Sequence, residues 1–436
     1  MTVSETSSAD NWHIKNVRIV DPYTHTDALG DIFIAGGCFV SGTLPGMLTV
    51  DATGLWAVPR MVDIHVHFRE PGQEHKEDLV SGSRAAAGGG FSVVAAMPNT
   101  DPVIDNPALI SWEEARGREI GLIDLWPLGA VTKASAGKEL AELALMEAAG
   151  AVGFSDDGKP VANGRIMRTA LSYATMLKHP IVQHAEDLDL SEGTVMHEGN
   201  ISHRLGLPGV PAAAEEAMVW RDVELSLLTH GPLHVAHVTA LGSLEAVAYG
   251  KRLGAPVTAE ATPHHLLLTD QAVVDWEVSP VTKVNPPLRP PKLRDALRKA
   301  VASGLVSVIA SDHAPHHDDE KMSPYPQAPY GISGLETSIG AAFSSLLHTG
   351  LMDPLTLLER MTSGPHQALG AWYPGVVPGA RADLTLIDPQ LLWVVDPQTF
   401  YSRGHNTPMA GMQLKGKAVA TMLRGRWTMR EGQVLA

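Results

Sequence analysis

Apolar runs of four to nine residues alternate with segments rich in helix-forming residues through the middle of the chain. Alternating strands and helices favour a parallel sheet with helices outside it, and eight strands are the number that closes a barrel. The sequence therefore predicts an α/β fold with a (β/α)8 TIM-type barrel over residues 58–370. The eight predicted strands are 58–64, 92–97, 122–130, 151–154, 180–183, 233–236, 256–259 and 306–310.

Both ends of the chain show a different pattern, in which short apolar stretches are separated by glycine and proline turns. This pattern is typical of β-strands, and neither end has enough apolar residues for a core of its own. We therefore expect residues 1–57 and 371–436 to form one small composite β-sandwich domain. The expected strands are 13–20, 31–35, 39–41 and 47–50 at the start, and 382–387, 392–395, 413–417, 418–423 and 425–430 at the end.

Composition and charge narrow the class of protein. Hydrophobic residues make up 44% of the 436 residues and charged residues 19%, as in a soluble globular enzyme, and no apolar run approaches the roughly 18 residues of a membrane span. Residues 1–11 lack the features of a signal peptide, and a single cysteine, Cys38, fits a reducing cytoplasm. A net charge of −15 argues against nucleic-acid binding and means that an anionic substrate needs local basic groups.

Potential metal ligands stand at the carboxyl ends of five of the eight predicted strands. His65 and His67 are two residues apart, so on a strand their side chains point the same way. In a parallel barrel all these ends meet on one face, where active sites lie. Four histidines and two carboxylate positions exceed the needs of one tetrahedral zinc and suit two metal ions bridged by a carboxylate. The residues are His65, His67, Asp156 or Asp157, His184, His237 and Asp312.

Such a site predicts metal-assisted hydrolysis of an amide, or its reversal. Water bound between two metal ions has its pKa lowered to about 7 and supplies hydroxide at neutral pH, while the carbonyl oxygen is polarised. Asp312 is then placed to take the proton from the bridging hydroxide and pass it to the leaving nitrogen. Arg69, two residues beyond His67, is placed to meet an anionic substrate.

Seven motifs resemble those of the type I bacterial dihydroorotases of the amidohydrolase superfamily, from about residue 12 to the C-terminus. The resemblance implies reversible hydrolysis of (S)-dihydroorotate to N-carbamoyl-L-aspartate, the third step of de novo pyrimidine synthesis, with zinc as cofactor and two ions per subunit. The motifs are HVHFREPG at 65–72, AMPNTDPVIDN at 96–106, GFSDDG at 153–158, QHAED at 183–187, HVAHVT at 234–239, KVNPPLR at 283–289 and SDHAPH at 311–316.

The resemblance also implies a role for each ligand. His65 and His67 match ligands of the first zinc, and His184 and His237 match ligands of the second. Asp312 matches a metal ligand that also shuttles the proton. Type I enzymes use an aspartate where many superfamily members have a carboxylated lysine, and the family's spacing favours Asp157 over Asp156 as the bridge.

Six further residues match substrate-binding positions of the family. Arg69, Asn99 and Asn285 are expected to bind the substrate carboxylate, since an arginine can grip a carboxylate through two parallel hydrogen bonds. His316, Tyr330 and Gly331 are expected to contact the substrate from the loop that follows the eighth strand. That loop, residues 316–334, has the polar, proline-rich composition of a lid. The family usually has phenylalanine where Tyr330 stands, which a backbone contact would tolerate.

Two other functions compete with this hypothesis. An allantoinase or hydantoinase shares the metal site, but a dedicated arginine such as Arg69 suits a substrate that bears its own carboxylate. An inactive scaffold for aspartate transcarbamoylase would have lost metal ligands, and this chain retains all of them. The partners expected are the small-molecule substrate, a second copy of the chain in a dimer, and aspartate transcarbamoylase. His264, His265 and the acidic run 317–320 are expected to lie outside the site.

Overall fold

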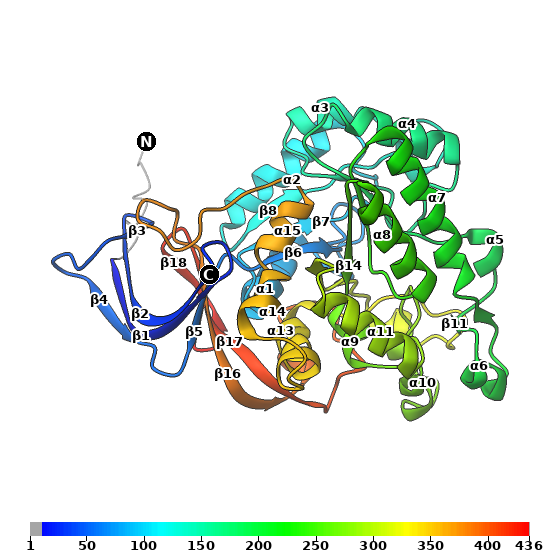
Figure 1. Cartoon of the computed structure of the whole chain (residues 1–436). Coiled ribbons are helices and arrows are strands. Elements are labelled where there is room, and N and C mark those ends of the chain that lie inside the picture. The colour runs from blue at the N-terminus through cyan, green and yellow to red at the C-terminus, as the bar shows by residue number, and fades with distance from the viewer. Residues whose placement is uncertain (1–10, 436) are drawn as a thin grey trace.

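The computed structural model describes residues 11–435 and shows a helix-covered barrel beside a β-rich region (Figure 1). Neighbouring barrel strands pair in parallel, and the bridges Gly129–Phe154 and Val66–His313 join the two barrel sheets into a closed ring. The predicted (β/α)8 TIM-type barrel is confirmed. Its strands are β6 (Val62–Val66), β7 (Val93–Ala96), β8 (Asp124–Pro127), β9 (Phe154–Ser155), β10 (Ile181–Gln183), β13 (Leu233–Val235), β14 (Val257–Ala261) and β15 (Val308–Ile309).

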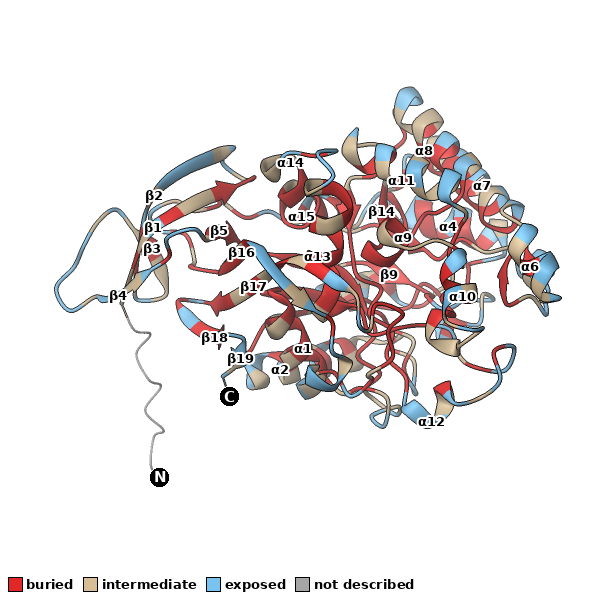
Figure 2. Ribbon diagram, turned by 90° about the horizontal axis from the view of Figure 1, so that it is seen from below, coloured by how far each residue is buried: buried red, intermediate tan, exposed pale blue. Residues whose placement is uncertain are grey.

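Helices cover the outside of the barrel because the barrel strands present apolar residues outward, and some strands, such as β7, are apolar on both faces. In β7, Val93 and Ala95 belong to one buried cluster inside the barrel, while Val94 and Ala96 pack in the cluster shared with the helices. Figure 2 shows the strands buried and the outer faces of the helices exposed. The principal covering helices are α1 (Leu79–Gly89), α2 (Pro107–Ile120), α3 (Leu143–Ala148), α4 (Gly164–Ala174), α7 (Ala213–Thr229), α8 (Leu241–Leu253), α11 (Pro291–Ala302), α14 (Pro354–Glu359) and α15 (Ser363–Ala368).

Short elements follow several strands at their carboxyl ends, the side on which the candidate ligands lie. They follow β10, β14 and β15, and α12 lies near the start of the loop after β15. No helix within residues 11–435 is both long and apolar enough to cross a membrane. These short elements are α5 (Leu188–Ser191), β11 (Met196–His197), α6 (Asn200–Leu205), β12 (Gly209–Val210), α9 (Pro263–Leu267), α10 (Gln271–Asp275), α12 (Asp318–Lys321) and α13 (Ser338–Ala342).

The two ends of the chain share one nine-stranded sheet, in the order β19-β18-β17-β16-β5-β1-β2-β3 with β4 beside β1. The rings of Trp12 in β1 and Trp427 in β18 pack edge to face, 5.6 Å apart, although three strands separate β1 from β18 in this order. The sheet therefore curls over its own apolar core. Its strands are β1 (Trp12–Asp21), β2 (Thr26–Ala35), β3 (Cys38–Val40), β4 (Leu48–Asp51), β5 (Trp56–Pro59), β16 (Leu384–Val394), β17 (Gln413–Leu423), β18 (Arg426–Arg430) and β19 (Gln433–Val434).

The prediction of a single strand over residues 58–64 is wrong. Arg60 has a left-handed backbone (φ 43°), and its guanidinium is held by Asp383 and Asp124 at 2.8 and 3.2 Å. The chain therefore turns at Arg60: β5 joins the terminal sheet, while β6 starts the barrel. We propose the domain division expected above, 1–57 with 371–436 and 58–370, because the terminal sheet has one buried cluster made of its own residues alone, beside a larger cluster that both parts share. Residues 1–10 and 436 lie outside the described residues.

Candidate metal centre and substrate cavity

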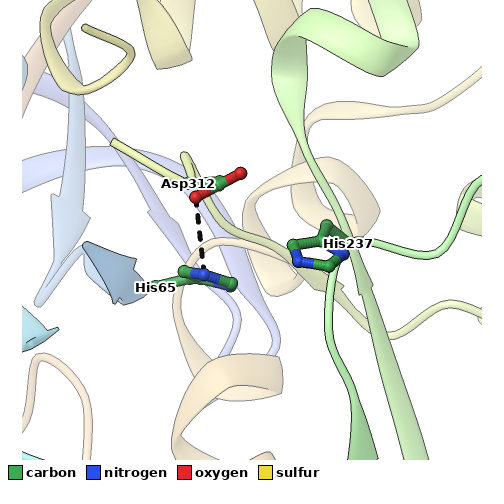
Figure 3. A group of neighbouring side chains, drawn as sticks. All are labelled: His65, His237 and Asp312. Carbon is green, nitrogen blue, oxygen red and sulfur yellow. Dashed lines mark ion pairs between the residues drawn. The ribbon is translucent and has the colours of Figure 1, made fainter. Parts of the chain in front are cut away.

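All six predicted metal ligands, with Asp157 as the favoured bridge, converge at the carboxyl ends of the barrel strands. Three overlapping triplets of their ligand atoms each lie within 4.8 Å, and every residue in them is buried. In Figure 3 the side chains of His65 in β6, His237 just after β13 and Asp312 just after β15 point toward one another, and a dashed line joins His65 and Asp312. The triplets are His65, His237 and Asp312; His65, His67 and Asp157; and Asp157, His184 and His237.

Asp157 lies between the two pairs of histidines. Its Oδ1 is 3.5 Å from His65 Nε2, 3.4 Å from His184 Nδ1 and 3.7 Å from His237 Nε2. Its Oδ2 is 3.5 Å from His67 Nε2. Two ligands bound to one tetrahedral zinc at its usual bond lengths are about 3.4 Å apart. The spacing around Asp157 is therefore that of a ligand shared between two ions.

Asp156 points away from this cluster. Its carboxylate accepts a 2.9 Å hydrogen bond from the Thr132 backbone N–H and another from the Thr132 hydroxyl. These bonds join the loop after β9 to the loop after β8. Asp156 thus has partners of its own, while Asp157 has the position and orientation of a bridging ligand.

The polar atoms of the cluster fit a metal ion. His65 Nε2 and Asp157 Oδ1 are buried without a hydrogen-bond partner, which is costly unless another group satisfies them. Burial lowers the pKa of His184, but its contacts with Asp157 and Glu186 outweigh burial and raise that pKa to about 10. A field that favours protonated imidazoles also favours a metal cation at the same place.

Glu260 orients His65 from behind the cluster. Its Oε1 accepts the Nδ1–H of His65, and its Oε2 lies 3.1 Å from His234 Nε2. The Nδ1–H bond leaves the Nε2 lone pair of His65 free to face the cluster, as in carboxylate–histidine–zinc arrangements. The sequence prediction missed Glu260. Its available signal was a carboxylate inside the otherwise apolar run of β14.

Glu186 and Asn99 orient two other histidines of the cluster by hydrogen bonds to the far side of their rings. Glu186 Oε2 lies 3.1 Å from His184 Nε2, so that His184 presents Nδ1 to the cluster. Asn99 Oδ1 accepts from His67 Nδ1 at 2.9 Å. Asn99 was predicted as a substrate ligand only. Glu186 was also missed, although it follows His184 by two residues in the QHAED motif.

Replacing Glu260 by glutamine is expected to weaken metal binding by roughly 10- to 100-fold, the usual effect of removing a partner that orients a metal-binding histidine. The amide keeps the shape of the side chain but removes its charge. Competition with a chromogenic chelator measures the change. Glu245→Gln, on the exposed face of α8, is the control. An unchanged affinity would mean that Glu260 serves the fold alone.

A cavity of about 370 Å³ opens onto the cluster. All six predicted substrate residues line it, together with five of the ligands, and three of the six come from the loop after β15, at positions 316, 330 and 331. The structure therefore brings the two predicted sets of residues to one place. The lining residues are His67, Arg69, Asn99, Asp157, Gly158, His184, His237, Asn285, Asp312, Ala314, His316, Pro329, Tyr330 and Gly331.

Arg69 is the cation nearest to the reacting end of this cavity. It is 8% exposed, and its Nε donates to the Pro315 carbonyl at 3.3 Å. Burial lowers the pKa of Arg69 to about 10, so the guanidinium stays charged at neutral pH. Asn285, by contrast, donates its amide to Glu186 at 2.8 Å. Arg69 is therefore the main positive group available to an anionic ligand.

Three residues of the site have left-handed backbones, which is uncommon outside glycine. The φ angles are 63° at Arg69, 31° at His237 and 48° at Asp312. Such conformations persist where the surrounding structure dictates them, and they cluster at functional sites. Asp63 helps to hold the backbone next to Asp312, since its carboxylate accepts from the backbone N–H of Ser311 as well as from that of His65.

His264 and His265 are buried beside the site but do not line the cavity. His265 is 2.7 Å from the Thr262 hydroxyl and 2.8 Å from the Pro286 carbonyl, as expected of a structural histidine. In the run 317–320, Glu320 forms an ion pair with Lys76 at 3.1 Å, and its carboxylate also lies 3.5 Å from His316 Nδ1. These residues lie outside the metal cluster.

Comparison with known proteins agrees with this geometry. A family model described as dihydro-orotase-like matches residues 54–243. A dihydroorotase from Pelotomaculum thermopropionicum is 46% identical over 96% of this chain and 98% of its own length. One from Pelobacter propionicus is 45% identical over 96% of this chain and 100% of its own.

Solved structures of other enzymes share the fold. The L-hydantoinase (dihydropyrimidinase) from Arthrobacter aurescens superposes with a TM-score of 0.86 at 23% identity, covering 98% of both chains. A dihydropyrimidinase from Brevibacillus agri NCHU1002 gives 0.83 at 22% identity, covering 98% of this chain and 96% of the other. Fold and relatives together define an amidohydrolase that acts on a cyclic amide. Within that class, the chain belongs to the dihydroorotase family, as the sequence motifs predicted.

Proposed function

We propose that the chain interconverts (S)-dihydroorotate and N-carbamoyl-L-aspartate, the third step of de novo pyrimidine synthesis. The observation that carries the proposal is the cavity in which the buried, charged Arg69 faces the histidine–aspartate cluster. The substrate has a ring amide to be hydrolysed and a carboxylate of its own. An allantoinase or hydantoinase is not favoured, because the curated relatives that cover the whole chain are dihydroorotases.

The cluster would hold two zinc ions. His65, His67 and Asp157 would bind one, His184, His237 and Asp157 the other, with Asp312 beside His65 and His67. When bound, the ions lower the pKa of water to about 7 and polarise the amide carbonyl. The chain's own contribution is to fix the ligand atoms, through hydrogen bonds from the far side of three of the four rings, those of His65, His67 and His184.

Asp312 would act as the proton carrier. Its Oδ1 is 3.1 Å from His67 Nε2 and 3.4 Å from His65 Nε2, and its side chain lines the cavity. Burial raises the pKa of Asp312, but the neighbouring histidines outweigh burial and hold it well below its usual value. Asp312 is therefore ionised at neutral pH, the form that would accept a proton from the attacking water and deliver it to the leaving ring nitrogen.

The remaining cavity residues would bind and orient the substrate. Arg69 can grip its carboxylate with two parallel hydrogen bonds, and Asn99 and Asn285 flank the same wall. The Nε2–H of His316 donates to the Tyr330 carbonyl at 2.7 Å. Burial, followed by the charge of Arg69, lowers the pKa of His316 to about 2, so the ring is neutral when substrate binds.

The type I resemblance supports three further proposals: a cytoplasmic location, a homodimer, and association with aspartate transcarbamoylase. Light scattering of the purified chain tests the dimer. Co-purification with the transcarbamoylase of the same organism tests the association. A purified chain that is monomeric and fully active on its own would contradict both the homodimer and the association.

Arg69→Met should lower kcat/KM for dihydroorotate by roughly 100-fold, the cost of losing hydrogen bonds to a charged group, while zinc content stays unchanged. Steady-state hydrolysis of dihydroorotate, hydantoin and allantoin by the wild type, with metal analysis of both proteins, tests the proposal. The control is Arg168→Met on the exposed face of α4. Preference of the wild type for hydantoin or allantoin would refute the function, and loss of zinc would make Arg69 structural.

A further inference from the structure

Two buried lysines hold the loop that follows β15, and neither belongs to the site described above. Lys321, at the end of α12, is 7% exposed. Its Nζ donates to the carbonyls of Pro329 at 2.8 Å, Pro280 at 3.1 Å and Lys283 at 3.5 Å. The side chain thus joins the start of the loop to its end and to the segment before α11.

Lys283 reaches the same loop from the other side. It is 2% exposed, and its Nζ donates to the carbonyls of Pro326 at 2.9 Å and Ala328 at 2.8 Å. The ammonium group also lies 4.3 Å from the centre of the Tyr330 ring, within cation–π distance. In return, the Gly331 N–H donates to the Lys283 carbonyl at 2.9 Å.

The held segment, 326–331, is the wall of the cavity. Pro329, Tyr330 and Gly331 line the cavity, and the Tyr330 carbonyl is a partner of His316. Asn406 holds the far end, since its amide donates to the Gly331 carbonyl at 3.3 Å. A wall that meets its ligand through backbone atoms works only if the backbone is held in place.

Placing two ammonium groups in this loop is costly, which argues for a specific role. Neither lysine forms an ion pair with a carboxylate within residues 11–435, and burial lowers the pKa of Lys321 to about 7 and that of Lys283 to about 8. Neutral side chains would fill the space at lower cost. Neutral side chains, however, lack the N–H donors with which the two ammonium groups together satisfy five backbone carbonyls.

We propose that Lys283 and Lys321 are positioning residues that keep segment 326–331 as a preformed wall of the substrate cavity. The segment then is a fixed binding surface, in place of the mobile lid that its composition predicts. A preformed wall lowers the entropy lost when the substrate binds, so the lysines act on substrate affinity more than on the chemical step. This inference rests on the function proposed above.

Kinetics of Lys321→Met and Lys283→Met provide the first test. Each variant should raise KM for dihydroorotate by roughly tenfold, consistent with the loss of hydrogen bonds to a charged group, with kcat changed less than about threefold and zinc content kept. Lys292→Met, exposed on α11, is the matched control. An unchanged KM, or a collapse of kcat together with zinc loss, would overturn the proposal.

Hydrogen exchange gives a second test that needs no variant and no turnover. In the zinc-loaded wild type without substrate, the Gly331 amide should exchange slowly, because it is bonded to the Lys283 carbonyl in a held segment. Rapid exchange of this amide would contradict a preformed wall. A wild type that fails to hydrolyse dihydroorotate would instead refute the proposed function and leave the exchange result standing.

Discussion

Asp312→Ala is expected to lower kcat for dihydroorotate hydrolysis by roughly 1,000-fold or more. General acid–base catalysis alone contributes about 10²- to 10⁴-fold, and Asp312 also lies within 3.4 Å of two histidines of the candidate metal centre. No other carboxylate lines the cavity except Asp157, whose two oxygens face the histidines. Steady-state kinetics in both directions measure the loss.

Two further variants separate the proton transfer from the metal site. Asp312→Asn keeps the shape of the side chain and one oxygen ligand but accepts a proton poorly, so it should lose nearly as much kcat as alanine while retaining zinc. Asp319→Ala, exposed in α12, should behave as wild type. Activity of Asp312→Asn within tenfold of wild type would rule out the proton-carrier role.

The barrel could be predicted because its sequence pattern is local. Each buried strand is an apolar run, and each helix beside it has its own periodicity and end signals, such as Asp78 and Gly90 at the two ends of α1. The turn at Arg60 could not be predicted in the same way. It depends on Asp124 and Asp383, which lie 64 and 323 residues away along the chain.

The ligands and cavity residues could be predicted for a related reason. A closed parallel barrel brings all its carboxyl ends to one face, so residues such as His65 and Asp312 need only be placed on the correct strands. The residues that orient them follow no such rule. Glu260 acts on His65 from 195 residues away, and Lys321 acts through carbonyls that any residue could supply.

Asp157→Ala is expected to lose zinc and activity, whereas Asp156→Ala is expected to lose stability. Asp157 faces all four histidines, so its loss should remove bound zinc. Removing a residue that only orients a metal ligand lowers activity by up to about 100-fold, so removing Asp157 itself should lower kcat/KM by at least roughly that factor. The measurements are zinc per chain after dialysis and the rate of dihydroorotate hydrolysis.

Asp156→Ala should instead keep its zinc and unfold more easily. Its carboxylate is bonded to the backbone and hydroxyl of Thr132, and leaving these buried donors without a partner costs about 1–3 kcal/mol of stability. A lower Tm with zinc intact is thus the expected result. The two variants are neighbours in the chain and carry the same change, so each is the control for the other. Equal zinc loss in both would mean that the loop after β9, rather than the carboxylate of Asp157, holds the metal.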